Sequence, residues 1–139
     1  MNAYVDSSVL LRKALGQPRA LKEQINRPVS SVLIVAESLR TLDRLRLRDH
    51  LSVAEIATRR QAIISAVASL ELIELDADVL GRAAQPMPTE LGTLDAIHLA
   101  SALLWQEATG EILTMATHDS ALALAAQAYG MNVVGVALT

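Results

Sequence analysis

The chain has 139 residues, of which 52% are hydrophobic and 19% charged, and its net charge at pH 7 is −3. This length and apolar content predict a single folded domain over residues 1–139 and argue against disorder. The negative charge argues against binding of nucleic acid by bulk charge alone, although acids around bound cations would mask a basic surface. The absence of cysteine excludes disulfides and thiolate metal sites, and the near absence of aromatic residues argues against base-stacking surfaces.

No targeting or membrane segment is expected. The first residues lack a basic region, and Asp6 interrupts the apolar stretch there, so we predict no signal peptide. The uncharged stretch 120–139 is long enough to raise the question of a membrane span, but Gln127, Gly130 and Asn132 divide it into a helix and a strand. We therefore expect a cytoplasmic protein without a membrane association.

Short strands and helices alternate along the chain. Strands are predicted over the segments 2–5, 72–75, 112–115 and 132–136. Helices are predicted over about 7–15, 20–25, 31–48, 52–70, 76–84, 93–107 and 119–129. Their expected end signals are Ser7 or Ser8, the capping box of Ser52 and Glu55, Thr93, and Gly110. Strands separated by helices predict an α/β fold with parallel pairing and right-handed crossovers.

Asp6 stands where the strand pattern changes to a helix pattern, which places its carboxylate at the carboxyl end of a strand. Ligands of open α/β sheets bind at that edge. Asp6 is also a plausible helix cap, because Asp is favoured there, although Ser7 and Ser8 are available too. Both interpretations stay open for Asp6 alone.

Three further acids occupy comparable positions. Glu37 interrupts an apolar segment, where it either pairs with Arg40 on the surface or is buried and needs a partner. Asp95 lies in the first turn of an apolar helix, and Asp119 directly follows a strand. Both positions also suit an acid that is stabilised by the helix dipole. Thr117, two residues before Asp119, either orients a carboxylate or caps the helix.

Taken together, the four acids favour a cation site. Converging carboxylates would repel one another unless cations compensate them, and Mg²⁺ is typically held by a few carboxylates with water and phosphate. Such a site can activate water and stabilise the leaving oxygen of a phosphodiester. Arg40, Arg44 and Arg48 share the helix face of Glu37, where they either are solvated or guide a phosphate backbone. The histidines do not supply a zinc site, so His98 and His118 are assigned to supporting or packing positions.

Four motifs together resemble the PIN-domain nucleases, and within them the VapC toxins of toxin–antitoxin pairs. The motifs are Asp6-Ser-Ser-Val-Leu-Leu, Ala36-Glu-Ser-Leu-Arg, Leu94-Asp-Ala-Ile-His-Leu-Ala and Thr117-His-Asp. They occur in the order of the family and span essentially the whole chain. The resemblance implies a three-layer α/β/α PIN-like fold with a central parallel sheet of four or five short strands.

The resemblance also implies an activity, namely that of a Mg²⁺- or Mn²⁺-dependent endoribonuclease that hydrolyses RNA. By this resemblance, Asp6, Glu37 and Asp95 are the core metal-binding acids and Asp119 is a fourth. Thr117 would be the hydrogen-bonding neighbour of Asp119, and Ser7 a supporting residue beside Asp6. The expected partners are RNA, a second copy of the chain in a homodimer, and a cognate antitoxin that inhibits the enzyme.

Other functions fit the sequence less well. A phosphoacceptor domain needs adjacent acids near the first strand and a late lysine, whereas the only lysines are Lys13 and Lys22. A dehalogenase-like phosphatase would place a second acid at Ser8, and no glycine pattern suits a dinucleotide or P-loop site. The remaining alternative is a non-catalytic PIN-like module that binds RNA or a partner, which the presence of all four acids disfavours.

Overall fold

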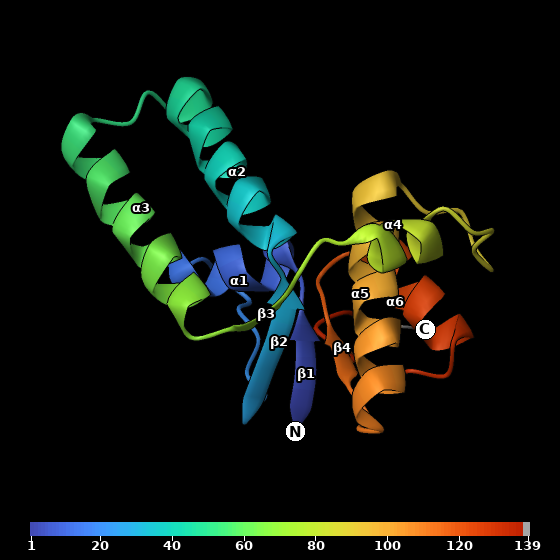
Figure 1. Cartoon of the computed structure of the whole chain (residues 1–139). Helices are drawn as coiled ribbons and strands as arrows, with labels where there is room; N and C mark the ends of the chain where they lie inside the picture. Colours follow the sequence, from blue (N-terminus) through green and yellow to red (C-terminus); the bar gives the residue numbers. More distant parts are fainter. Residues whose placement is uncertain (138–139) are drawn as a thin grey trace.

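Strands and helices alternate in the computed structural model, which describes residues 1–137. The strands are β1 (Asn2–Val5), β2 (Arg27–Ser31), β3 (Glu71–Ile73), β4 (Thr114–Ala116) and β5 (Val133–Val134). The helices are α1 (Ser7–Ala14), α2 (Leu33–Asp49), α3 (Val53–Ala68), α4 (Ala77–Ala83), α5 (Thr93–Thr109) and α6 (Ser120–Ala128). The strands form one parallel sheet in the order β3-β2-β1-β4-β5 (Figure 1). The predicted parallel α/β sheet is therefore confirmed.

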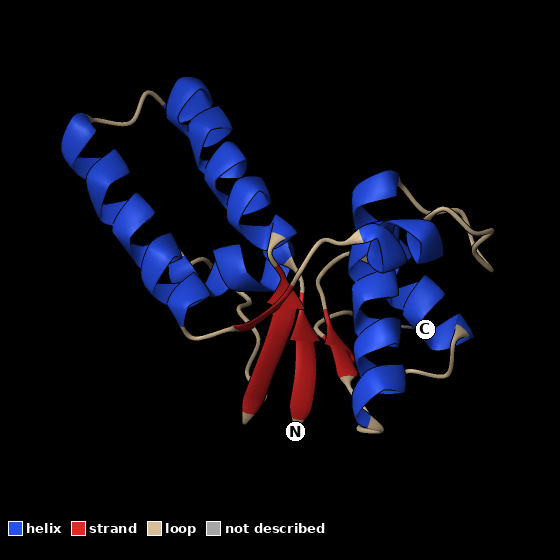
Figure 2. Ribbon diagram, in the orientation of Figure 1, coloured by secondary structure: helices blue, strands red, loops and turns tan. Residues whose placement is uncertain are grey.

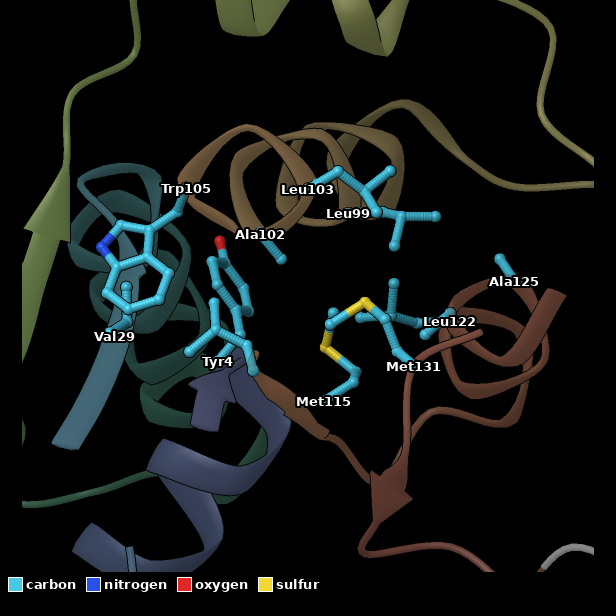
Figure 3. Close-up of a cluster of buried hydrophobic side chains, with 12 residues drawn as sticks. Tyr4, Val29, Leu99, Ala102, Leu103, Trp105, Met115, Leu122, Ala125 and Met131 are labelled. Carbon is cyan, nitrogen blue, oxygen red and sulfur yellow. The ribbon is translucent and has the colours of Figure 1, made fainter. Parts of the chain in front are cut away.

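Helices cover both faces of this sheet, as Figure 2 shows. Side chains of a strand alternate between its two faces, so Ala3 and Val5 join a core with α1, α2 and α3, whereas Tyr4 joins a core with α5 and α6. Figure 3 shows the second cluster, in which Tyr4 and Met115 from the sheet meet Leu99 and Leu122 from the helices. Two hydrophobic cores, one on each side of the sheet, make the predicted three-layer arrangement.

The strand β2 was missed by the sequence pattern. Ser30 and Ser31 were expected to open a helix, but both lie in β2 and are fully buried. The Ser30 hydroxyl donates to the Val5 carbonyl (2.7 Å), and the Ser31 hydroxyl accepts from the Leu33 amide (3.1 Å). These hydrogen bonds satisfy the two buried hydroxyl groups. The strand therefore lacks the apolar run by which buried strands are recognised.

The helix predicted over residues 20–25 is also wrong. That segment is irregular. Its apolar pair, Leu21 and Ile25, is partly buried against the core beside α1 and α3. Two apolar residues four positions apart match one face of a helical turn. Here they instead anchor an irregular loop to the hydrophobic core. Tertiary burial outweighs the weak local pattern.

Two predicted caps are corrected and two are confirmed. Asp6, not a serine, caps α1, and Gly92 rather than Thr93 precedes α5. The capping box of Ser52 and Glu55 opens α3 as predicted. Gly110 ends α5 with a φ of 72°, a left-handed conformation that glycine adopts without strain.

The helices α2 and α3 run side by side away from the sheet as a hairpin (Figure 1). Within residues 1–137, every helix is too short or too polar to cross a bilayer. The single domain predicted over residues 1–139 includes positions 138 and 139, which lie outside the described residues.

Candidate functional site

Three neighbouring strands end at the same edge of the sheet and bring three of the acids there. Asp6 directly follows the central strand β1, and Asp119 follows β4 by three residues. Glu37 lies in the second turn of α2, which begins just after β2. Asp95 comes from a different direction, since it lies in the first turn of α5. The carboxyl edge is where ligands bind in open parallel sheets, so this placement agrees with the predicted position of the site.

The carboxylate of Asp6 is the most firmly held of the four. Its side chain is buried, and Oδ1 accepts hydrogen bonds from the Ser8 hydroxyl (2.6 Å) and from the Val9 amide (3.1 Å). Oδ2 accepts from the Thr117 hydroxyl (2.5 Å). The bond from Val9 is an N-cap bond. Asp6 is thus both a helix cap and an acid at the sheet edge, and the two interpretations of the sequence are compatible.

A turn after β4 supports this arrangement. The Ser8 hydroxyl accepts a hydrogen bond from the His118 amide (2.9 Å), and the Thr117 hydroxyl accepts one from the Asp119 amide (2.9 Å). The prediction that Thr117 contacts Asp119 therefore holds for its backbone, but the carboxylate that Thr117 binds is that of Asp6. Ser8, rather than the predicted Ser7, donates to Asp6, and Ser7 lines a groove beside Glu37.

Asp119 is exposed and caps α6. Its Oδ1 accepts from the amides of Ala121 (2.8 Å) and Leu122 (3.0 Å). These bonds engage one carboxylate oxygen only. Capping therefore accounts for part of the role of Asp119 and is compatible with a contribution from its second oxygen.

Glu37 is held by a histidine of α5. The Nε2 atom of His98 is hydrogen-bonded to its Oε1, and the side chain of Glu37 is only 14% exposed. Arg40, the surface partner considered for Glu37, instead pairs with Asp43 at 3.2 Å. The flanking apolar residues thus indicated correctly that Glu37 is largely buried and needs a partner.

Asp95 experiences the electrostatic effect of the other acids. Partial burial raises the pKa of its carboxyl from 3.8 to about 6, and the negative charges of Asp119, Asp6 and Glu37 add to this rise, which His98 partly offsets. Like charges that share a poorly solvated region disfavour one another's ionised forms. Asp95 is therefore close enough to the other three acids for their charges to act on it, although the four come from separate elements of the chain.

The donors suit a hard divalent cation. They are carboxylate oxygens, the ligands that Mg²⁺ and Mn²⁺ prefer, and their mutual repulsion is what a cation would relieve. Their side chains are not assembled into a coordination sphere, because residues 1–137 hold no group of three or more His, Cys, Asp or Glu placed to hold a metal ion. The residues therefore fit the ion by chemistry and charge, while the structure shows only their common neighbourhood.

A groove of about 370 Å³ extends from Glu37 along α2. Ser7 and Glu37 lie at one part of its wall, and Arg40 and Arg44 at another. Arg48 lies beyond the groove near the end of α2, where it pairs with Asp49 at 3.0 Å. The structure thus brings two of the three predicted arginines to the site.

Three residues at the site were missed or underrated by the sequence interpretation, namely Tyr4, Ser8 and His98. Ser8 was considered only as a cap, and His98 only as a supporting or packing residue. The spacing of three between Asp95 and His98 was the available signal, since it places both on one face of a helix. His118 packs differently, because its Nδ1 is hydrogen-bonded to the Gly135 carbonyl at 2.8 Å.

Comparisons with known proteins agree with this geometry. The model of the PIN domain family matches residues 3–127. Ribonuclease VapC46 of Mycobacterium tuberculosis (strain ATCC 25618 / H37Rv) is 36% identical over 136 residues, which are 94% of this chain and 95% of that protein.

Two solved structures share the fold. PAE2754 from Pyrobaculum aerophilum has a TM-score of 0.64 and 20% identity, and the match covers 96% of this chain and 84% of that one. VapBC-5 from M. tuberculosis, a member of the VapBC family of toxin–antitoxin systems, has a TM-score of 0.62 and 19% identity, with 96% and 97% covered. Together with the sequence matches, these findings show that the chain belongs to the PIN domain family.

Proposed function

We propose that this protein is a Mg²⁺- or Mn²⁺-dependent endoribonuclease. The observation that carries the proposal is the convergence of acids from separate elements: Asp6, Glu37 and Asp119 follow three neighbouring strands at the carboxyl edge of the sheet. Asp95 on α5 lies near them, and their charges add to the rise in its pKa that burial mainly causes. Membership of the PIN domain family and the 36% identity to a ribonuclease support the same activity. A non-catalytic binding module would have no need for four acids that repel one another.

The acids Asp6, Glu37, Asp95 and Asp119 would hold the divalent ion. When bound, such an ion lowers the pKa of a water molecule and stabilises the leaving oxygen of a phosphodiester. The chain's own contribution is to orient the ligands. Asp6 is fixed by Ser8 and Thr117, and Glu37 by His98. Fixing the ligands before the substrate arrives reduces the reorganisation needed during the reaction.

The groove along α2 would hold the RNA backbone beside the acids. Arg40 and Arg44 are exposed and present guanidinium groups, which suit phosphate oxygens. Leu94, half-exposed in the same groove, supplies an apolar wall. The groove therefore contains both Glu37 and the positive charges of Arg40 and Arg44. The net negative charge of the chain is thus compatible with binding of an anionic substrate.

The proposal extends to a toxin of a toxin–antitoxin pair. Its support is the likeness to a VapC ribonuclease over nearly the full length of both chains. The proposed partners are RNA, a cognate antitoxin that inhibits the enzyme, and a second copy of the chain, and the proposed location is the cytoplasm.

Inducible expression in bacteria without an antitoxin tests this function. We expect growth to stop within a few doublings and RNA from the arrested cells to carry discrete breaks. A strain that expresses Asp6→Asn at an equal level should grow normally, because the substitution removes a ligand charge. Continued growth with intact RNA in the unsubstituted strain, at matched expression of folded protein, would count against the toxin role.

A further inference from the structure

A hydrogen-bonded chain of three side chains links the central strand to the acid on α2. Tyr4 on β1 lies against α5 (Figure 3), and its hydroxyl is 2.6 Å from Nδ1 of His98. Nε2 of the same imidazole is hydrogen-bonded to Oε1 of Glu37. Tyr4 and His98 are 0% and 1% exposed, so water does not compete for these bonds.

The chain of bonds has a preferred direction. The Tyr4 hydroxyl is buried and carries one hydrogen, which it can donate to Nδ1 at the observed distance of 2.6 Å. In a neutral imidazole one nitrogen accepts and the other carries the hydrogen, and the hydrogen bond made at one nitrogen sets the tautomer. With Nδ1 as acceptor, Nε2 carries the hydrogen and donates it to Glu37. The carboxylate thereby receives a donor without itself being protonated.

The same contacts fix the orientation of the imidazole. The Tyr4 and His98 rings pack edge to face, with centroids 5.7 Å apart and planes inclined by 69°. Hydrogen bonds at both nitrogens then prevent the ring from flipping. Glu37 needs such an anchor, because a glutamate side chain has several rotatable bonds and loses entropy when it is held. The donor engages Oε1 and leaves the second oxygen for a cation.

We propose that His98 is a positioning residue that holds Glu37 in its ligand orientation, and that Tyr4 holds His98 in the required tautomer. This inference rests on the proposed function, in that Glu37 is taken as a ligand of the divalent ion. Ser8 and Thr117 play the same role at Asp6, because their hydroxyl groups donate to its carboxylate and hold it in place. Groups that orient metal ligands in this way commonly affect metal affinity and activity by about 10–100-fold.

Two nearly isosteric substitutions separate positioning from packing. His98→Gln retains an N–H donor at about the position of Nε2, whereas His98→Met fills similar volume and donates nothing. Three properties of each variant are to be measured. They are Mn²⁺ binding by electron paramagnetic resonance, the thermal midpoint of unfolding, and the kcat and KM of RNA cleavage. The inference predicts that His98→Met weakens Mn²⁺ binding about 10–100-fold and lowers kcat. His98→Gln should retain most of both, although it is no more stable than His98→Met.

Equal Mn²⁺ affinity in the Gln and Met variants would overturn the inference, and if the unsubstituted chain still bound Mn²⁺ and cleaved RNA, the proposed function would stand. No Mn²⁺ binding by the unsubstituted chain would instead overturn the proposed function. The exposed His50→Gln serves as the matched control and should change neither measurement.

The tautomer provides a readout that needs neither metal nor RNA. The chain has three histidines, so ¹⁵N-detected imidazole spectra are simple, and loss of one set of signals in His98→Gln assigns His98. We expect the hydrogen of neutral His98 on Nε2, and a change in its Nδ1 shift in Tyr4→Phe. A hydrogen on Nδ1 in the unsubstituted chain would contradict the proposed direction of the bonds.

Discussion

The hydroxyl of Thr117 donates a 2.5 Å hydrogen bond to Oδ2 of Asp6, across a separation of 111 residues. Both residues follow adjacent parallel strands, β1 and β4, and both are buried. The hydroxyl also accepts from the Asp119 amide, so one side chain connects two of the predicted acids. The parallel pairing of β1 and β4 therefore brings Asp6, near the start of the chain, close to Thr117 and Asp119, near its end.

Removal of this hydroxyl should impair the site more than the fold. Thr117→Val keeps the shape but leaves the Asp6 oxygen with one charge-assisted bond fewer, which costs about 1.5–3 kcal/mol of unfolding free energy. We expect RNA cleavage to fall by about 10–100-fold, as for other groups that orient metal ligands. Thr117→Ser retains the hydroxyl and should keep most of the activity. Equal losses in the two variants would contradict a specific role of the hydrogen bond.

Neutralising Asp95 should stabilise the metal-free protein while it abolishes cleavage. The rise of its pKa from 3.8 to about 6 means that ionisation is disfavoured in the folded state. At about 1.4 kcal/mol per pKa unit the penalty is at most ~3 kcal/mol. Solvent screening at this half-buried position reduces it to about 1 kcal/mol. Asp95→Asn should therefore raise the thermal midpoint in EDTA by roughly 3–5 °C.

The stabilisation should depend on pH in a defined direction. A carboxyl whose folded pKa is raised binds its proton more tightly in the folded state, so its contribution to stability falls as the pH rises from about 4 to about 6. The gain in unfolding free energy from Asp95→Asn should thus be complete above about pH 6 and absent below about pH 4. Asp49→Asn is the control, because Arg48 lowers the pKa of Asp49 and its removal should not stabilise. A pH-independent gain for Asp95→Asn would contradict the electrostatic cause.

Gly135 should tolerate no side chain. Its φ is 104°, and a Cβ there would lie 2.3 Å from the Thr117 carbonyl oxygen. Gly135→Ala should therefore destabilise the fold by about 2–4 kcal/mol and displace the turn that holds Asp6. Gly81→Ala is the matched control in α4, where nothing lies within 4 Å, and it should stabilise by ~0.5–1 kcal/mol. Chemical denaturation of the two variants measures both effects.

The arginines of the groove should act on RNA binding and not on the chemical step. In an Asp6→Asn background, which removes cleavage, Arg40→Gln and Arg44→Gln should each weaken binding of single-stranded RNA. Each should also reduce the slope of log affinity against log salt by about 0.7, the value for one phosphate contact. Arg48→Gln lies outside the groove and should leave the slope unchanged. An equal effect of all three substitutions would indicate a diffuse charge effect instead.

Much of the fold was predictable because its local signals agree with its tertiary structure. The capping box at Ser52 and the glycine that ends α5 mark boundaries that the structure keeps. The strand β2 was not predictable from the pattern, because it contains two buried serines, and the hydrogen-bond partner of Ser30 is the Val5 carbonyl on the neighbouring strand β1. Only the assembled sheet supplies that partner.

The site divides in the same way. The positions of Asp6 and Asp119 near strand ends could be predicted, because the hydrophobic pattern of the sequence changes from that of a strand to that of a helix at these residues. The hydrogen bonds that link Tyr4 to His98 and His98 to Glu37 join side chains 94 and 61 positions apart, and the His118 amide that binds Ser8 is 110 positions away. The spacing of Asp95 and His98 places both on one helix face but does not identify these distant partners. The kind of site was thus predictable from the residue types of its acids. The hydrogen bonds that orient those acids became visible only in the folded structure.

Cleavage of total RNA by the purified chain tests the central claim most directly. The protein is first treated with EDTA, then assayed with added Mn²⁺ or Mg²⁺, and Asp95→Asn is assayed beside it after its fold has been verified. The account predicts discrete RNA fragments only when the metal is restored, and none with Asp95→Asn. Cleavage that persists in EDTA, or that is undiminished in Asp95→Asn, would contradict a carboxylate-held metal centre.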